Sequence, residues 1–160
     1  MTRLHQIQSE VATRVEQIAT AHGNWPCHKG CDDCCRHLAS EPRVTRAEWQ
    51  LVDDAIRALP RETAQAVRQR IRDGAGQARP VVCPMLDTSA GACLIYDARP
   101  VACRTYGFYA ERQDVLGCHR IESLSSEAPD VIWGNHASVE AASRDLGDAK
   151  ELSAWLSSEW

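Results

Sequence analysis

The stretch Cys27-His28-Lys29-Gly30-Cys31-Asp32-Asp33-Cys34-Cys35 contains four of the chain's eight cysteines. Thiolates are soft ligands that suit zinc, copper(I) and iron-sulfur clusters, and a Cys-x-x-Cys spacing lets two sulfurs bind one ion. At about 100° per residue, a helix would hold all four sulfurs within an arc of roughly 100°. With or without a regular helix at Gly30, we therefore expect these four thiols to converge.

The other four cysteines lie in a stretch that is rich in proline and glycine and has no helical periodicity. We expect loops and short strands from Gly74 to about Leu124, where backbone N–H groups can hydrogen-bond metal-bound sulfur. All eight cysteines are candidate metal ligands, enough for two closed four-sulfur sites. They are Cys27, Cys31, Cys34, Cys35, Cys83, Cys93, Cys103 and Cys118.

Other roles for the cysteines are open. A free cysteine is often a small buried hydrophobe, and Cys31-x-x-Cys34 has the spacing of a thioredoxin-like redox motif. The strand expected before such a redox motif is missing. The neighbours Cys34 and Cys35 are predicted to point apart, so that they serve two metals, or one binds metal and the other packs.

Helical periodicity surrounds the cysteine-rich stretches. From Thr2 to His22, apolar residues recur at steps of three and four, which predicts a helix ending at Gly23. A second helix is predicted from Thr45, which forms a capping box with Glu48. A third follows Pro60 and continues to Gly74.

The chain's end repeats the helical pattern. Periodicity returns from Ile132 to Leu146, and Asp148 with Glu151 offers a capping signature before a short apolar segment. Arg68, Arg70 and Arg72 alternate with apolar positions of the third helix and are expected on a solvated face. We predict a mainly α fold, with several helices packed around an irregular cysteine-rich metal-binding core and at most short strands. Residues 1–160 are expected to form a single cysteine-cluster metal-binding domain.

The composition excludes several classes of partner. The 160 residues carry a formal net charge of -4, so a nucleic-acid or membrane-surface binder is not expected. No signal peptide and no apolar run of about 18 residues is present, which favours a cytoplasmic protein. In a reducing cytosol, cysteines indicate metal or redox chemistry before structural disulfides. Leu, Ile, Val and Phe total only 30, so the apolar core is lean.

A longer motif resembles a known family. Cys27-x3-Cys31-x2-Cys34-Cys35 is followed by Cys83-Pro84-x-Leu86 and then by Cys93-x-Ile95-Tyr96-x2-Arg99-Pro100-x2-Cys103-Arg104. This order is similar to that of the bacterial CxxCxxCC family of zinc- or iron-chelating proteins, over about half of the chain. One extra residue separates the first two cysteines. The resemblance implies metal binding, and related cysteine clusters occur in flagellin lysine methylases.

Charged and aromatic neighbours complete the candidate site. A zinc ion or an oxidised 4Fe-4S cluster with four thiolates carries a charge of -2, which nearby cations would offset. Lys29, Arg36, Arg99 and Arg104 adjoin the cysteines in sequence, and His28 and His119 are possible imidazole ligands. The acids Asp32 and Asp33 are expected at the solvent edge. Tyr106, Phe108 and Tyr109 are expected to pack over the cysteine loops.

Three functions fit these features. The first is chelation of zinc or iron through the cysteine cluster, with zinc favoured because no substrate machinery is visible. The second is a redox or radical-type enzyme, or its accessory domain, that holds a 4Fe-4S cluster. The third is a thiol-based metal carrier. No phosphate-binding loop, dinucleotide fingerprint, nucleophile elbow or His-Glu-x-x-His motif is present, so the catalytic residues are unknown.

Overall fold

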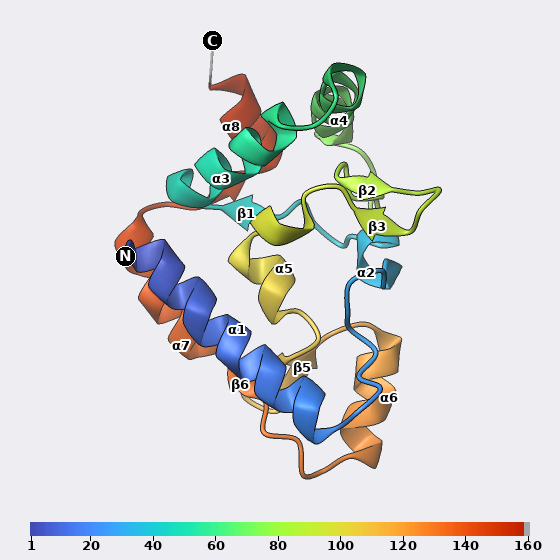
Figure 1. The fold of residues 1–160 in the computed structure, drawn as a ribbon, viewed down its shortest axis with the longest axis vertical. Coiled ribbons are helices and arrows are strands. Elements are labelled where there is room, and N and C mark those ends of the chain that lie inside the picture. The colour runs from blue at the N-terminus through green and yellow to red at the C-terminus, as the bar shows by residue number, and fades with distance from the viewer. Residues whose placement is uncertain (159–160) are drawn as a thin grey trace. The chain divides into compact units, whose positions relative to one another are not determined.

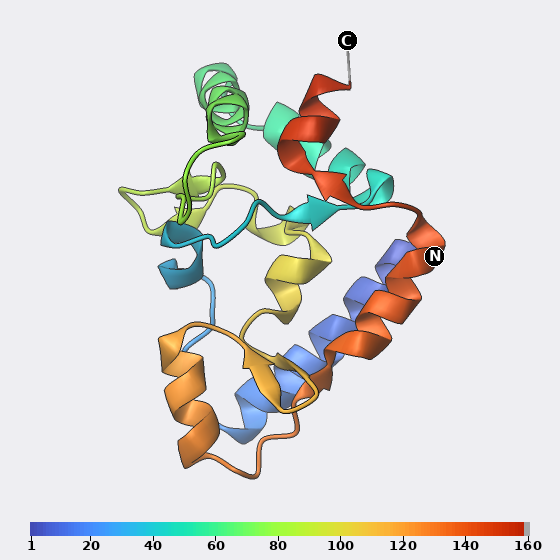
Figure 2. The same cartoon turned by 180° about the vertical axis from the view of Figure 1, so that it is seen from behind.

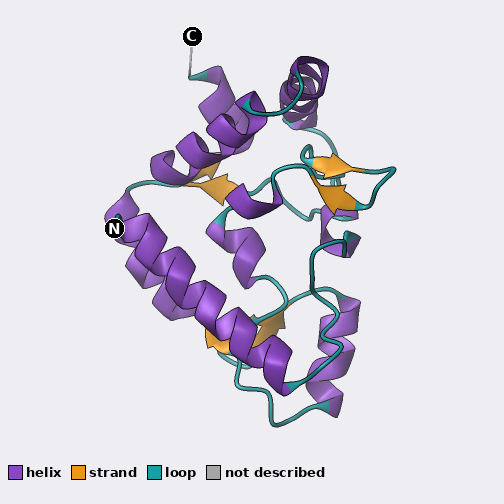
Figure 3. Cartoon of the chain, in the orientation of Figure 1, coloured by secondary structure: helices purple, strands orange, loops and turns teal. Residues whose placement is uncertain are grey.

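The computed structural model describes residues 1–158 and divides into two compact units (Figure 1). Unit 1 comprises Met1–His28 and Val101–Gly147, and unit 2 comprises Lys29–Pro100 and the residues from Asp148 onward. Helices contain 53% of the described residues and strands only 11%. Figure 3 shows how short the strands are beside the helices. The mainly α prediction is confirmed, and a single domain over residues 1–160 stays a prediction.

Unit 1 packs helices against a small sheet. In chain order its elements are α1 (Arg3–Ala21), α5 (Val101–Thr105), β4 (Tyr109–Glu111), β5 (Asp114–Leu116), α6 (His119–Glu127), β6 (Gly134–Asn135), α7 (His136–Ser143) and the 3-10 turn η2 (Arg144–Leu146). The sheet order is β5-β4-β6, with β4 antiparallel to β5 and parallel to β6. Helix α7 lies along α1, as both views of the ribbon show (Figures 1 and 2).

The predicted first helix is confirmed. Its N-cap is Thr2, whose hydroxyl accepts a hydrogen bond from the backbone N–H of His5, and it ends at Ala21. The apolar stripe faces the core of unit 1, where Leu4, Ile7, Val11 and Ile18 are buried. Local periodicity is enough to predict such a helix because its burial repeats every three or four residues.

Unit 2 contains the remaining elements. They are α2 (Asp33–Arg36), β1 (Arg43–Val44), α3 (Arg46–Arg57), α4 (Arg61–Gly74), β2 (Leu86–Asp87), β3 (Ala92–Cys93), the 3-10 turn η1 (Tyr96–Ala98), β7 (Lys150–Glu151) and α8 (Leu152–Ser157). Strand β1 pairs antiparallel with β7, and β2 pairs antiparallel with β3. Helices α3, α4 and α8 enclose one apolar core. Met85 and Ile95 belong to it and attach the β2–β3 hairpin.

The helices of unit 2 begin where the sequence predicts. The capping box of Thr45 and Glu48 is present at the start of α3, and Pro60 is the N-cap of α4. The core is built from Val44, Trp49, Val52, Ile56, Val67, Ile71, Met85, Ile95, Leu152 and Leu156. Met85 and Ile95 each lie two residues after a cysteine, so this core supports the cysteine loops as well as the helices.

Two structural details differ from the sequence predictions. The stretch predicted as loops and short strands also contains α5 and α6, which the periodicity does not show because α5 is one short turn and α6 buries only Ile121. The prediction that Arg68 lies on a solvated face is wrong: its guanidinium pairs with the buried Asp53 and its side chain is 21% exposed. Arg57 also pairs with Asp53, at 2.6 Å.

Helix α8 begins with a cap from a distant residue. The predicted signature of Asp148 and Glu151 does not act, because Glu151 is the N-cap and makes no side-chain cap hydrogen bond. Instead the buried Glu41 accepts hydrogen bonds from Ser153, at 2.5 Å from the backbone N–H and 2.9 Å from the hydroxyl. Glu41 thus satisfies a backbone donor that the first turn of a helix leaves unpaired.

Replacing Glu41 with alanine is expected to destabilise the chain by about 1–2 kcal/mol, the usual cost of losing a helix cap. The matched control is Glu151→Ala, which removes an exposed carboxylate at the same helix end but no cap hydrogen bond, so its effect should stay within about 0.5 kcal/mol. Urea unfolding of both variants measures the difference. Equal losses would contradict the assignment of Glu41 as the cap.

Candidate metal centre

The eight cysteines are divided between the two units. Unit 2 holds Cys31, Cys34, Cys35, Cys83 and Cys93, and unit 1 holds Cys27, Cys103 and Cys118. Each of the eight side chains is partly buried. The predicted helical arc of four thiols does not form, because Gly30 takes a positive φ of 97° and α2 begins only at Asp33.

Backbone pairing brings the segment after α2 alongside the segment before β2. Leu38 and Val81 form an isolated antiparallel bridge, with N···O distances of 2.9 and 3.0 Å. Next to it the N–H of Cys83 donates to the carbonyl of Cys35 at 2.7 Å. These bonds place Cys35 and Cys83 side by side, although the two residues are far apart in the sequence.

The β2–β3 hairpin adds a third segment. Leu86 pairs with Cys93 across the hairpin, and the N–H of Leu94 donates to the carbonyl of Met85 at 2.9 Å. Met85 and Ile95 are 4% and 5% exposed, and both belong to the core of unit 2. Burial of these two residues anchors the loops that carry Cys83 and Cys93.

The pKa values of Cys34 and Cys35 depend on neighbouring thiols, Cys83 among them. The Cys34 thiol donates to Cys35, and this bond, together with burial, raises the pKa of Cys34 far above its ordinary value. At Cys35 the bond from Cys34 lowers the pKa, but donation to Cys83 and burial outweigh that effect and raise the pKa to about 12. The prediction that Cys34 and Cys35 point apart disagrees with this interaction between their side chains.

Cys93 completes this group, which we call the four-thiol group (Cys34, Cys35, Cys83 and Cys93). Burial raises the pKa of the Cys93 thiol, while a hydrogen bond from the backbone N–H of Ile95 and the charge of Arg99 act in the opposite direction. The charge of Cys93 raises the pKa of Cys35, and the charge of Cys34 raises the pKa of Cys93. The two thiols are thus electrostatically coupled to Cys93.

Two cations lie on the ring of Tyr96, and one of them, Arg99, acts on Cys93 of the four-thiol group. The Arg99 guanidinium is 3.6 Å from the centre of the Tyr96 ring, and the Lys29 ammonium is 5.2 Å from it. Arg99 also donates to the carbonyl of Tyr96 at 2.9 Å. The sequence motif includes Tyr96 but does not show this contact, through which Tyr96 positions Arg99, whose charge lowers the pKa of Cys93.

Arg36 has a structural contact of its own. It donates to Asp32 at 2.5 Å and to the carbonyl of Thr88 in the β2–β3 turn at 3.0 Å. A Cβ added to Gly91 in that turn would lie 3.2 Å from Asp32. Asp32 and Arg36 therefore hold α2 against the hairpin, and the Asp32 carboxylate is engaged with Arg36 within unit 2.

In unit 1 the Cys27 side chain lies against a glycine. A Cβ built on Gly107 would be 2.2 Å from the sulfur of Cys27, so only glycine fits there, and Gly107 has a positive φ of 88°. Trp25 donates from Nε1 to the carbonyl of Gly107 at 3.0 Å and stacks on Phe108 with ring centres 5.9 Å apart. The aromatic packing of unit 1 thus positions Cys27.

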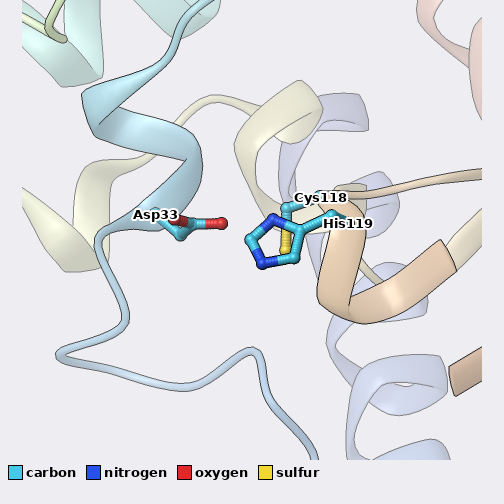
Figure 4. Close-up of side chains that lie close together, drawn as sticks. All are labelled: Asp33, Cys118 and His119. Carbon is cyan, nitrogen blue, oxygen red and sulfur yellow. The ribbon is translucent and has the colours of Figure 1, made fainter. Parts of the chain in front are cut away.

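Cys118 and His119 begin α6 in unit 1, and Asp33 begins α2 in unit 2 (Figure 4). Cys118 is the N-cap of α6, and His119 is an exposed residue of its first turn. The Asp33 side chain is 22% exposed. All three side chains can serve as metal ligands, and Asp33 is the one that sequence reasoning assigned to the solvent edge instead.

The remaining candidates have varied surroundings. His28 is exposed in unit 1, and Phe108 and Tyr109 are buried at 6% and 5% exposure, in agreement with a packing role. Tyr106 is 39% exposed. Arg104 lies in α5, one residue after Cys103.

A comparison with family models assigns this cysteine pattern. The model of the CxxCxxCC family, described as "Putative zinc- or iron-chelating domain", matches residues 26–127, more than half of the chain. The chain belongs to the CxxCxxCC family. The CxxCxxCC match includes all eight cysteines, Cys118 among them, although the motif visible in the sequence ends at Arg104.

No curated protein and no solved structure matches this CxxCxxCC chain. Within residues 1–158, every helix is too short or too polar to span a lipid bilayer. Family membership makes the chain part of a zinc- or iron-chelating group of domains. Which metal it takes, and through which sulfurs, has to be argued from the site.

Proposed function

We propose that the chain binds a zinc ion through the four-thiol group of unit 2. The observation that supports this most directly is the mutual effect of these side chains on their pKa values, although they come from α2, from the segment before β2 and from β3. Four cysteine sulfurs are the complete ligand set of a closed structural zinc site. The donors present therefore fit zinc without any further group.

The surroundings fit the charge of such a site. Four thiolates and one Zn²⁺ carry a net charge of -2, and Arg99 already lowers the cost of negative charge at Cys93. Lys29 shares the Tyr96 ring with Arg99. The backbone N–H of Ile95 hydrogen-bonds the Cys93 sulfur, as donors around metal-bound thiolates do. When bound, the zinc would tie three chain segments together.

The other cysteines remain proposed metal ligands. Cys31 provides an additional thiol in unit 2, and Cys27, Cys103 and Cys118 provide thiols in unit 1. We propose a cytoplasmic protein whose partner is the metal ion, with no nucleic-acid or membrane partner. The alternative functions are a 4Fe-4S enzyme or accessory domain, possible because such a cluster also needs four thiolates, and a metal carrier.

Elemental analysis of protein purified anaerobically without added metal tests the proposal. A colourless protein with bound zinc supports it. A brown protein with acid-labile sulfide would favour the iron-sulfur alternative, and partial, readily exchanged zinc would favour a carrier. A folded protein that contains neither zinc nor iron would contradict metal binding altogether.

Removal of the metal is expected to loosen the cysteine segments before the capped helices. Binding energy supplies order where apolar burial is scarce, as it is from Cys27 to Cys35, where no residue is fully buried. From residue 80 to residue 124 it adds to the apolar burial that already anchors the loops. Hydrogen exchange with and without a chelator should show lost protection in these segments, while α1 and α3 keep most of theirs. Protection that does not change on chelation would show that the lean apolar core is sufficient by itself.

Metal affinity is expected to rise with pH. In the metal-free protein the pKa of Cys34 is well above its ordinary value and that of Cys35 is about 12, so both are protonated near neutral pH and metal must displace two protons. Each displaced proton changes the apparent affinity about tenfold per pH unit. Competition with a chromophoric chelator between about pH 6 and pH 8 measures the slope. A flat profile would exclude these two thiols as ligands.

A further inference from the structure

Within the described residues, a pocket in unit 2 is lined by no cysteine. It has a volume of about 510 Å³ and is formed by α3, β7 and α8, three elements that lie together in Figure 2. Its lining residues are Arg46, Trp49, Gln50, Arg57, Lys150, Trp155 and Ser158. Its size is within the range of small-molecule sites.

The charge of this pocket is positive. Arg46, Arg57 and Lys150 contribute to its lining, and within the described part of the chain no acidic side chain does. Asp53 does not neutralise it, because this single buried carboxylate is shared by Arg57 and Arg68. Three cations line this pocket in a chain whose formal net charge is -4. An anion is therefore the ligand that the pocket favours.

The walls of the pocket are aromatic. Trp49 is 3% exposed and forms part of the core, whereas Trp155 is only partly buried. The Lys150 ammonium is 4.8 Å from the centre of the Trp155 ring, which shows that the indole face is turned toward a cation of the lining. The Trp155 Nε1–H donates to the carbonyl of Val44 at 2.8 Å, so the ring has a fixed position before any ligand binds.

From this combination we infer that the pocket binds a nucleoside monophosphate. Arg46 and Lys150 pair with its phosphate through charge-assisted hydrogen bonds, and the base lies against the Trp155 indole. An inorganic anion alone would leave the indole wall uncovered, and a neutral nucleoside would leave the cations unpaired. The site uses side chains instead of a glycine-rich loop, and this explains why no nucleotide motif appears in the sequence.

Isothermal titration calorimetry of the full chain with adenosine monophosphate tests the inference. Adenosine monophosphate should bind saturably with a Kd below about 1 mM. Inorganic phosphate and adenosine should each bind at least about tenfold more weakly. Tryptophan fluorescence should change along the same saturation curve. Absence of saturable binding to the monophosphate, or equal binding of phosphate or adenosine, would overturn the inference.

Charge variants show where the ligand binds. Lys150→Gln removes an exposed cation whose strand pairing uses only the backbone, and it should weaken binding about tenfold. Arg61→Gln makes the same change of charge at an exposed position of α4 outside the pocket lining, and it should leave the affinity unchanged. Equal losses in the two variants would show a general charge effect instead of a site. Circular dichroism confirms that both variants are folded.

Discussion

Cys35→Ser is expected to weaken metal binding by about 100- to 1000-fold. Cys35 is the centre of the four-thiol group: it accepts a hydrogen bond from Cys34, donates to Cys83 and receives the Cys83 N–H on its carbonyl at 2.7 Å. Structural zinc sites bind with about 10–16 kcal/mol. With four ligands, each contributes about one quarter of that energy, about 2.5–4 kcal/mol. Losing one ligand therefore lowers the affinity by the stated factor. Competition with a chromophoric chelator measures it.

The matched control is Cys118→Ser, which makes the same atomic change in unit 1. Protein carrying this substitution should still hold the zinc of the four-thiol group with the affinity of the unchanged chain, even where Cys118 binds a second metal. The serine hydroxyl is close in size to the thiol, so loss of folding is not expected in either variant. If Cys35→Ser and Cys118→Ser bind metal identically, the four-thiol group of unit 2 is not the metal site.

Gly107→Ala is expected to destabilise the metal-free protein by about 2–5 kcal/mol. Alanine at a positive φ of 88° costs about 1–2 kcal/mol. Its Cβ would also lie 2.2 Å from the Cys27 sulfur and 3.7 Å from Ile121. Overpacking of that kind adds about 1–3 kcal/mol, because the sulfur must move away from a backbone that Trp25 holds in place. Urea unfolding monitored in the presence of a chelator gives the value.

Gly76→Ala separates the two causes. Gly76 has a similar positive φ of 74°, but a Cβ there meets nothing within 4 Å. Its substitution should therefore cost only the backbone term, about 1–2 kcal/mol. If Gly107→Ala destabilises the protein no more than Gly76→Ala does, a Cβ at position 107 does not disturb the Cys27 side chain.

Much of the helical structure could be predicted from local pattern. The stripe of α1, the capping box of α3 and the start of α4 at Pro60 are interactions between residues three or four positions apart. Neighbours at that spacing meet in any helix, whatever the rest of the chain does. The short helices α5 and α6 were missed because so few of their residues face a core.

Contacts between distant segments could not be predicted in the same way. Glu41 caps α8, which begins more than a hundred residues later, and Arg68 reaches Asp53 on a neighbouring helix. Both residues are charged, and neither position carries a signal of its partner in the sequence. Their partners are decided by how α3, α4 and α8 pack around the apolar core, so the alternation of arginines with apolar residues wrongly placed Arg68 in solvent.

The metal centre depends both on local sequence and on contacts between distant segments. The amino-acid sequence is enough to establish the chemistry: eight soft sulfur donors, their order along the chain and membership of a metal-chelating family. The fold establishes which cysteine-bearing segments lie together, because the Leu38–Val81 bridge and the β2–β3 hairpin pair the backbone of segments that are far apart in the sequence. Ligand identity is a property of each side chain, whereas ligand grouping depends on backbone pairing between segments that only the folded chain brings together.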